Sequence, residues 1–477
     1  YTIVDDPYLS QTVFIATVCT DTPFEADSNN LDYIRDIYNN APENHKLMIH
    51  LLVHSSNMMT LFQTTDLGIE FRDKIDIFPF TLDILCAHNL IVPSLCNPDM
   101  KKYPAPERDQ IDINSNKNVH VVIFGMNDTS QTLAKYIAHT CHYPNYIRDH
   151  SLRTRITIID KNILKEKDIF INKYQSLFDN SFHRTIDLSS PQRVVNFHYP
   201  QYFDNREDFV DIEWEFVNGD ITSSVLRDKL AKWGSSHTQD LSLYICDTVD
   251  ANNIEIALQL PQDLHSHNTP IFIKLDNRNL YGALSNNLTN NIYPFGVNEV
   301  EYDFNLPIVQ LAKMVNYTYD FCFKEVDDNN LKTPLEINWS EAEELWCQLS
   351  NKKRWSCIYN AMSIDCKMRI LGHKFTDWHT YYSINNREID ILANIEHNRW
   401  NVEELILGFR PTTDAQNDEI KNDITLKRKW RDKGFHYDLR AFNDLQKDDT
   451  GKSVKIYDQC LSASIPLIAS TYIKNYE

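Results

Sequence analysis

The strongest constraint on the fold of this chain is an alternation of strand-like and helix-like segments that continues to about residue 315. Short β-branched runs are typical of strands buried on both faces, and here each is followed by a turn and by helical periodicity. Parallel strands need long crossover connections, which helices usually supply. We therefore expect an α/β fold with tandem parallel-sheet units, followed by a helical linker and a small, mainly helical domain.

The most complete of these units starts at the β-branched run 118–124 (NVHVVIF), which is followed by Gly125. A helical pattern comes next, with Asp128 and Thr129 as candidate N-caps. A strand, a glycine turn, a helix and a second strand open a Rossmann-like unit, in which an acid after the second strand holds a ribose hydroxyl. Three acidic residues follow strands here and are expected to line the crevice of the unit: Asp160, Asp220 and Asp247.

The later part of this unit contains a Gly-Asp pair after one strand and two asparagines in the next helix: Gly219-Asp220 and Asn252-Asn253. This order of motifs resembles the RCK (TrkA-N) type of ligand-binding domain, which regulates potassium conductance. The resemblance covers about 118–315 and implies a complete Rossmann domain at 116–325. It also implies a homodimer or higher homo-oligomer, because tandem domains of this type assemble below a membrane pore.

Residues 1–112 repeat only the second half of this unit. Corresponding positions share a residue type or an apolar pattern: Val13 with Leu243, Asn30 with Asn253, 47–54 with 271–276, and Pro79 with Pro294. The alternative is a chance likeness between buried strands. If the repeat is real, half of a Rossmann unit and transmembrane helices are expected upstream of Tyr1. The chain would then lie in the cytoplasm, at the cytosolic face of the inner membrane.

Glycine is scarce, with 10 residues in a chain of 477, and no G-x-G occurs. Phosphate-binding loops use glycine because the backbone must approach the phosphate closely. This excludes P-loop NTPases, kinases and ordinary dehydrogenases. In the segment aligned with G-x-G-x-x-G only Gly125 remains, with Asn127 and Ser130 in place of the later glycines. Two interpretations stay open: an adenine-nucleotide site formed by Gly125, Asn127, Asp160, Asp220 and Asp247, or a degenerate unit that serves structure and dimerisation.

The charge and cysteine content exclude further classes. A net charge of −20 argues against a large nucleic-acid-binding surface, which needs clustered Lys and Arg. The ten cysteines form no C-x-x-C pair, so we expect free thiols in a reducing cytoplasm and no zinc site. No apolar run approaches the ~18 residues of a membrane helix, so the visible chain is expected to be soluble.

A helical linker is predicted at 326–384. It begins with an apparent capping box, Ser340 and Glu343, continues as one long helical pattern, and stops at Gly372. From residue 385 the pattern changes. Segments there resemble a ryanodine-receptor (RyR) repeat domain: HNRW at 397–400, EE at 403–404, GFR at 408–410 and HYD at 436–438. The resemblance covers 385–470. It departs from the family at Tyr437, where the family has proline, and at Gln459, where it has arginine.

The RyR resemblance implies ligand sensing, because bacterial proteins of this kind look like receptors of nucleotide signals in antiviral or stress systems. An arginine fork suits phosphate, an indole suits a base, and a basic stretch at 421–433 opposes the acidic remainder. The candidate ligand residues are His397, Asn398, Arg399, Trp400, Arg410, Lys429, His436 and Asp438. A structural alternative pairs Arg399 with Glu396 or Glu403 and places Trp400 in the core.

These observations favour a sensor that binds a small anionic ligand, such as an adenine nucleotide or an ADP-ribose derivative, and that acts as the regulatory part of a channel-like or effector protein. The alternative is a protein-interaction scaffold with degenerate nucleotide-binding units. We do not expect an enzyme, because the sequence contains no H-E-x-x-H, no deaminase-type H-x-E with cysteines, and no recognisable nucleophile–base pair.

Overall fold

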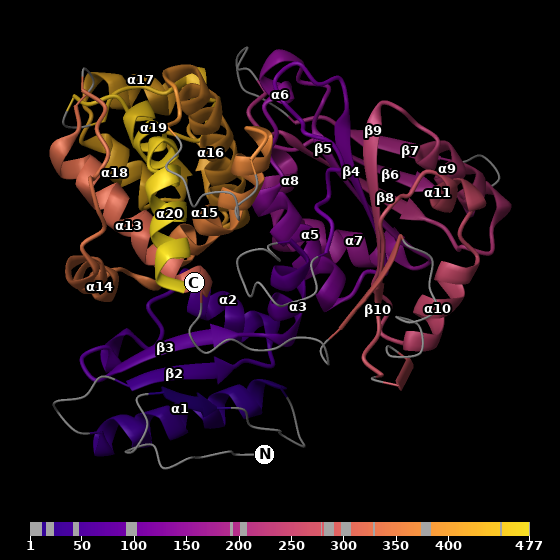
Figure 1. Ribbon diagram of the computed structural model, residues 1–477, viewed down its shortest axis with the longest axis horizontal. Helices are drawn as coiled ribbons and strands as arrows, with labels where there is room; N and C mark the ends of the chain where they lie inside the picture. Colours follow the sequence, from indigo (N-terminus) through magenta and orange to yellow (C-terminus); the bar gives the residue numbers. More distant parts are fainter. Residues whose placement is uncertain are drawn as a thin grey trace.

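The structure is a computed structural model that describes residues 12–15, 23–41, 47–91, 103–190, 194–200, 208–277, 279–280, 291–296, 307–327, 330–373, 383–448 and 451–476. Figure 1 shows a small N-terminal α/β unit in indigo, a larger α/β unit in purple to rose, and a helical part in orange to yellow. The α/β fold with a mostly parallel sheet is therefore confirmed.

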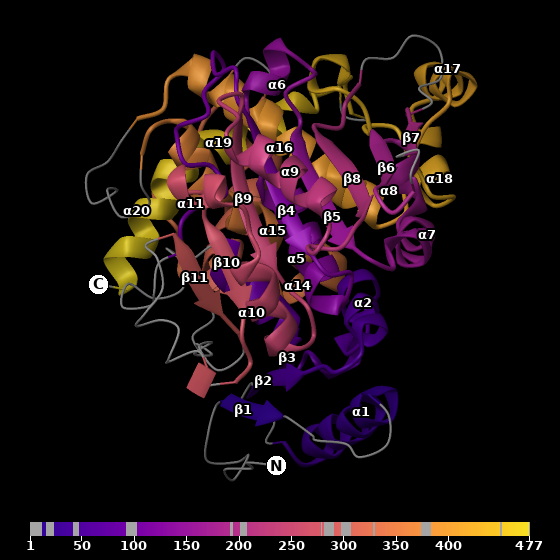
Figure 2. The same cartoon turned by 90° about the vertical axis from the view of Figure 1, so that its right-hand side faces the viewer.

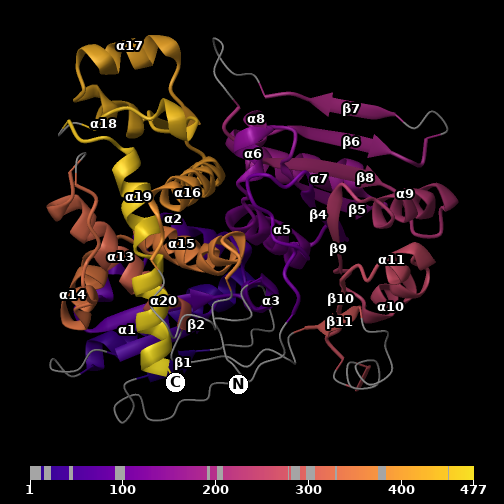
Figure 3. The same ribbon diagram turned by 45° about the horizontal axis from the view of Figure 1, so that its top comes forward.

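The larger unit contains one sheet of eight strands: β4 (Asn118–Phe124), β5 (Thr154–Asp160), β6 (His183–Asp187), β7 (Val195–His198), β8 (Ile212–Asn218), β9 (Gln239–Ile245), β10 (Ile271–Lys274) and β11 (Ile292–Phe295). The strands lie in the order β11-β10-β9-β4-β5-β8-β6-β7, and only the β6–β7 pair is antiparallel. Without β6 and β7 this is the 3-2-1-4-5-6 order of a Rossmann fold. Figures 2 and 3 show the sheet from its face and the β6–β7 extension at its edge.

Helices cover both faces of this sheet: α5 (Asp128–Thr140), α6 (Asn145–Arg148), α7 (Ile163–Lys173), α8 (Gln175–Asp179), α9 (Ser224–Gly234), α10 (Asp250–Leu258) and α11 (Gln262–Ser266). Side chains of β4 alternate between two cores. Val121 and Ile123 join the core that contains α5, α7 and α8. Val122 and Phe124 join the core under α9, α10 and α11. Burial on both faces explains why this strand is a continuous apolar run rather than an alternating one.

The N-terminal unit has a three-stranded parallel sheet in the order β1-β2-β3. Its elements are β1 (Thr12–Ile15), α1 (Pro23–Asn40), β2 (Leu47–Leu52), α2 (Ser56–Thr64), a 3-10 turn (Ile69–Phe71), β3 (Ile75–Phe80) and α3 (Leu82–Ile91). The pairing matches that of β9, β10 and β11. In one sheet Leu51 lies opposite Ile15 and Pro79, and in the other Ile273 lies opposite Ile245 and Pro294.

One side-chain contact is the same in both sheets. Asp27, on α1, accepts hydrogen bonds from the backbone N–H groups of His54 and Ser55, each at 2.9 Å. Asp250, on α10, accepts from the N–H groups of Asp276 and Asn277, at 3.0 and 2.8 Å. In each case a carboxylate in the first turns of a helix closes the end of the next strand. A chance likeness between the apolar patterns of two sets of strands would not explain why both sheets contain this contact.

The helical part comprises α13 (Pro307–Glu325), α14 (Trp339–Gln348), α15 (Asn351–Ile370), α16 (Asn386–Ile406), α17 (Asp414–Asn422), α18 (Leu426–Arg431), a 3-10 turn (Phe442–Asp444), α19 (Lys455–Ala463) and α20 (Ile465–Tyr476), with the short strands β12 (Arg410–Pro411) and β13 (Phe435–His436). The sequence placed α13 in the second α/β unit. In the structure α13 packs against α14, α15, α19 and α20, and so joins the helical part.

The predicted linker helix differs from the structure at its start and in its middle. The N-cap of α14 is Asn338, whose side chain accepts from the N–H of Glu341 at 3.4 Å, so the capping box expected at Ser340 was wrong. The long helix is also interrupted, because Ser350 leaves the helical conformation and caps the start of α15. The stop at Gly372 is confirmed, with φ at +80°.

No helix in the described ranges is long and apolar enough to cross a membrane. Eight cysteines fall within these ranges; all are free and six are buried, while Cys19 and Cys96 lie outside the described residues. Burial raises the pKa of Cys86 to about 12, which leaves its thiol protonated and unreactive.

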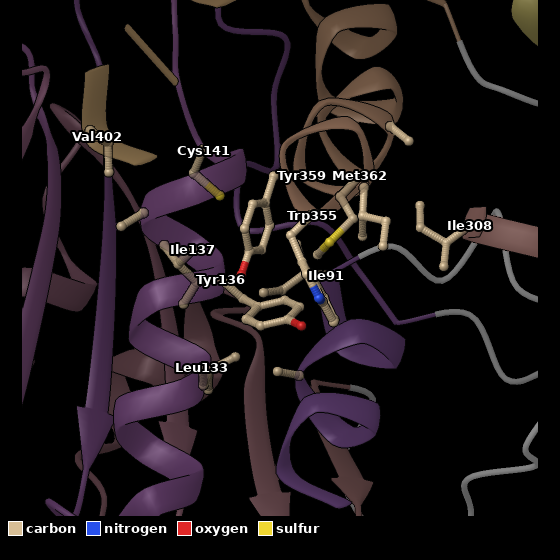
Figure 4. Close-up of a cluster of buried hydrophobic side chains, with 14 of the residues drawn as sticks. Ile91, Leu133, Tyr136, Ile137, Cys141, Ile308, Trp355, Tyr359, Met362 and Val402 are labelled. Carbon is tan, nitrogen blue, oxygen red and sulfur yellow. The ribbon is translucent and has the colours of Figure 1, made fainter. Parts of the chain in front are cut away.

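Helix α5 is the element around which the three parts meet. It packs on β4 and also contacts α3, α15 and α16. Figure 4 shows Tyr136 from α5 beside Tyr359 and Trp355 from α15, with Ile91 from α3 close by. The Tyr136 and Tyr359 rings lie edge-on, with centroids 6.2 Å apart. Residues distant in the sequence thus form one shared core.

Candidate functional sites

The glycine loop after β4 has the backbone shape of a Rossmann loop. Gly125 has a φ of +96° and donates its N–H to the carbonyl of Ile159 at 2.9 Å. A Cβ at this position would lie 3.2 Å from the carbonyl oxygen of Cys246. Positive φ and close backbone approach both require glycine here. The one glycine that remains therefore serves the turn between the strands, whatever the loop binds.

The side chain of Asn127 fills the position where a second glycine would leave space. Its Oδ1 accepts from the N–H of Ser130 at 3.1 Å, and its Nδ2 donates to the carbonyl of Cys246. Asn127 is thus the N-cap of α5, where the sequence favoured Asp128 or Thr129. The hydroxyl of Thr129 instead donates to Asp83 of α3. The side chains of Asn127 and Thr129 and the N–H of Ser130, which would face a phosphate at this helix start, therefore already have hydrogen-bond partners within the protein.

The three acidic residues predicted to line the crevice lie at the carboxyl ends of their strands and are engaged locally. Asp160 accepts from the N–H groups of Met126 and Asn162, at 3.1 and 2.6 Å. Asp220 accepts from the N–H of Thr222, which lowers the pKa of this carboxyl. Asp247 accepts from the N–H of Val249 at 2.9 Å and from Asn252 at 3.1 Å. These contacts close turns, which favours the structural interpretation of this crevice.

The HNRW motif lies in the second half of α16, and its first three residues are buried. Arg399 is 1% exposed and forms ion pairs with Glu396 at 2.8 Å and Glu403 at 2.7 Å. Lys367 of α15 also pairs with Glu396, at 2.5 Å. Burial alone raises the pKa of Glu396, but Arg399 and Lys367 outweigh it and hold the pKa at about 2. The guanidinium of Arg399 is thus occupied by carboxylates and joins α16 to α15 through Glu396.

The other two residues at the start of the motif are also bonded within the protein. Nε2 of His397 lies 3.0 Å from the carbonyl of Arg440, and Nδ1 lies 3.2 Å from Asp458. Asn398 donates to Asp211 of the large α/β unit at 3.2 Å, and His142 contacts the same carboxylate at 2.8 Å. The motif thereby connects the RyR-like segment to the sheet that it packs against.

Trp400, His436 and Asp438 form a second, partly accessible cluster. The ring of Trp400 is partly buried and lies edge-on to His436, with centroids 4.9 Å apart. Burial lowers the pKa of His436 to about 3, and its Nδ1 accepts the N–H of Asp438 at 3.2 Å, so the imidazole is neutral. Lys427 pairs with one oxygen of Asp438 at 2.8 Å. The other oxygen is buried without a hydrogen bond to any described residue.

The remaining predicted residues, Arg410 and Lys429, belong to an exposed cationic area that we call the open basic surface: Arg410, Arg428, Lys429, Arg431 and Lys433. Among the described residues none of these five forms an ion pair with a carboxylate. Arg410 lies over the ring of Phe435 at 5.7 Å, and Lys433 over that of Trp430 at 4.8 Å. Cations and aromatic faces thus stand together, as ligands with a ring and a phosphate require.

Two aromatic residues of this surface were not among the predicted ligand residues. Trp430 is partly exposed, and its indole N–H donates to Glu419 of α17 at 3.2 Å, which fixes the ring. The rings of Trp430 and Phe435 are edge-on, with centroids 5.9 Å apart. Their signal in the sequence was an aromatic residue inside a basic run, KRKWRDK, followed by Gly-Phe. Cationic and aromatic side chains together offer charge for a phosphate and a flat face for a base.

No cluster of three or more His, Cys, Asp or Glu side chains suited to a metal ion occurs within the part of the chain that the structure describes. Comparison of the chain with protein-family models, curated proteins and solved structures finds no match. The resemblances to RCK and RyR domains therefore rest on the residues named above.

Proposed function

We propose that this chain is a ligand-sensing regulatory protein that binds a small, nucleotide-derived anion on the RyR-like segment, at the open basic surface. The observation that carries the proposal is the set of five exposed cations without a carboxylate partner among the described residues, two of which lie over aromatic rings. The open basic surface is thus positively charged, whereas the chain as a whole has a net charge of −20. The RyR resemblance of 385–470 supports the same function.

The ligand would contact α18 and the β12–β13 pair. Arginine forks bind phosphate oxygens in pairs, and the partly exposed indole of Trp430 offers a face for a base. The crevice at the glycine loop of the Rossmann-like unit would take no ligand in this proposal, because Asn127 and the three acidic residues at the strand ends are engaged by backbone groups. The Rossmann-like units would instead dimerise and carry the response to whatever the protein regulates.

Calorimetry of the full chain with ADP-ribose, AMP and cyclic AMP tests this proposal. At least one should bind, and the variant Lys429→Ala/Arg431→Ala should bind it at least tenfold more weakly. Affinity should fall as salt rises from about 50 to 200 mM, because exposed charges are screened. Lys165→Ala is the matched control, since Lys165 is an exposed lysine of α7 in the other unit.

Absence of binding by all three probes would overturn the nucleotide proposal. Capture of a protein partner that depends on the open basic surface and on no small molecule would then favour the interaction scaffold. Arg399→Ala is unsuitable for this test, because Arg399 is buried between Glu396 and Glu403 and its loss is expected to destabilise the fold rather than to act on a ligand alone.

A further inference from the structure

A partly open cavity of about 90 Å³ lies where the N-terminal unit, the large α/β unit and the helical part meet. This space is several times what one water molecule needs, and because it is partly open to solvent a ligand need not fit inside it entirely. Its walls are the faces of helices. Asp128, Thr132, Lys135, Tyr136 and His139 line it from α5, at a spacing that places them on one side of that helix.

The opposite walls come from the other two parts of the molecule. Helix α2 contributes hydroxyl and amide groups, including Thr60 and Gln63, and α15 contributes Trp355 and Tyr359. Tyr174, at the end of α7, and Glu403 and Ile406 of α16 also line the cavity. The wall therefore combines flat aromatic rings with hydrogen-bonding groups. Figure 4 shows Tyr136, Trp355 and Tyr359 grouped between α5 and α15.

Most charged groups in this cavity already have partners. Glu403 pairs with Arg399 at 2.7 Å, Lys352 pairs with Glu404 at 3.0 Å, and Asp83 accepts the hydroxyl of Thr129. Asp128 is exposed and Lys135 is half-buried, and neither forms an ion pair with a described residue. The Nζ of Lys135 lies 5.4 Å from the centre of the Tyr174 ring.

We propose that this junction cavity is a second ligand site, for a small molecule in which a flat aromatic ring carries one anionic group. The anion is held by the ammonium of Lys135, and the ring lies among Tyr136, Tyr174 and Tyr359. The site is separate from the open basic surface and does not depend on it. Because the walls come from all three parts of the molecule, an occupant fixes their relative positions, which is how a ligand biases a conformational equilibrium.

The state of Lys135 agrees with this role. Burial lowers its pKa to about 8, while Asp128 and Asp83 act in the opposite direction. At pH 7.5 about a quarter of such amines are neutral, against about 0.1% for an ordinary lysine. An anion beside Lys135 restores the protonated form. Binding should therefore be accompanied by proton uptake, which calorimetry in buffers of different ionisation enthalpy measures.

Pyridoxal 5′-phosphate is a suitable probe, because it has a flat ring, a phosphate and an aldehyde. In the fraction of molecules in which Lys135 is neutral, its amine condenses with the aldehyde to an imine and releases one water molecule. The label therefore reports access of the probe to Lys135, while the contact between the ammonium and the anion is tested by the variants below. Borohydride then reduces the imine to a stable secondary amine that peptide mass spectrometry locates. We expect Lys135 to be labelled at least tenfold faster than the exposed Lys165. Equal or slower labelling of Lys135 would overturn the proposal.

Protection of Lys135 from labelling by a second compound distinguishes two classes of ligand that share a flat ring and an anionic group. AMP represents nucleoside phosphates and indole-3-acetate represents aromatic acids. Slower labelling of Lys135 in the presence of either one supports the site and identifies the source. Labelling that neither compound slows would overturn the proposed ligand class, even if Lys135 proves reactive.

Variants provide an independent test through calorimetry with pyridoxine 5′-phosphate, which lacks the aldehyde. Lys135→Gln should weaken binding at least tenfold, while Lys135→Arg, which keeps the charge, should retain it within about threefold. Equal losses in both would overturn a charge-based role, and the Arg variant still tests the site if the Gln variant does not fold. Lys429→Ala/Arg431→Ala should bind this probe in the cavity as the native protein does, which separates this site from the proposed function.

Discussion

Two helices of the RyR-like segment carry positive charge in opposite ways. In α16, Arg399 is 1% exposed and pairs with two carboxylates of its own helix. In α18, the cations Arg428, Lys429 and Arg431 are exposed and have no ion-pair partner in the described ranges. Residues 397–400 of α16, which most resemble the RyR family, are mostly buried and bonded within the protein. The segment without a recognisable motif has the groups that a ligand can reach.

The largest effect that tests this comparison is expected from Arg399→Ala. The substitution leaves Glu396 and Glu403 as buried carboxylates on one helix, and breaking a buried pair in this way costs about 3–5 kcal/mol. Urea unfolding followed by tryptophan fluorescence should show this loss, while Arg428→Ala should stay within about 0.5 kcal/mol. Similar small losses in both variants would mean that the two helices do not differ as described.

A second prediction concerns acid. The pKa of Glu396 in the folded chain is about 2, below its ordinary value near 4.5, so its contribution to stability is complete above pH 4.5. That contribution, about 3 kcal/mol, is lost as the pH falls toward 2. Glu403 acts in the opposite direction, because burial raises its pKa. The quantity to measure is therefore the difference in the free energy of unfolding between the native protein and the variant Glu396→Gln, in which the contribution of Glu403 is common to both. The stability gap between the native protein and Glu396→Gln should narrow steadily from pH 5 to pH 2, and a constant gap would contradict the prediction.

The contrast between α16 and α18 also shows what a sequence can predict. The Glu396–Arg399 contact was foreseeable as an alternative, because residues three apart on a helix are neighbours. Whether that pair faces water or the interior depends on Lys367 and the rest of α15, which the spacing does not reveal. The α/β class was equally foreseeable, because alternating strand and helix segments predict parallel strands joined by crossover helices.

Long-range packing decided the features that were missed. The chain between Leu349 and Asn351 looks helical by periodicity. In the structure Leu349 is the C-cap of α14, Ser350 is the N-cap of α15, and Arg72 donates to the carbonyl of Leu349 between them. The junction cavity was not foreseeable at all. Its walls come from α2, α5, α15 and α16, and no local pattern states which helices meet.

A third, smaller effect is expected in the glycine loop. Asn127→Ala removes the N-cap of α5 and its bond to the carbonyl of Cys246, and should cost about 1 kcal/mol. Asn127→Gly should cost only a few tenths, because glycine is tolerated at an N-cap. If the loop is degenerate as proposed, neither variant should gain affinity for AMP. Tighter AMP binding by Asn127→Gly would mean that only this side chain closes a working phosphate site.

The smallest expected change in stability separates the two helices most sharply. Lys429→Ala/Arg431→Ala should change the free energy of unfolding by no more than about 0.5 kcal/mol, because neither exposed side chain has a described ion-pair partner to lose. Removing like charges that lie close together can even stabilise the segment slightly. The same variant should lose at least tenfold in nucleotide affinity. A large loss of stability would show that these cations are part of the architecture, as Arg399 is, and the assignment of ligand binding to α18 would fail with it.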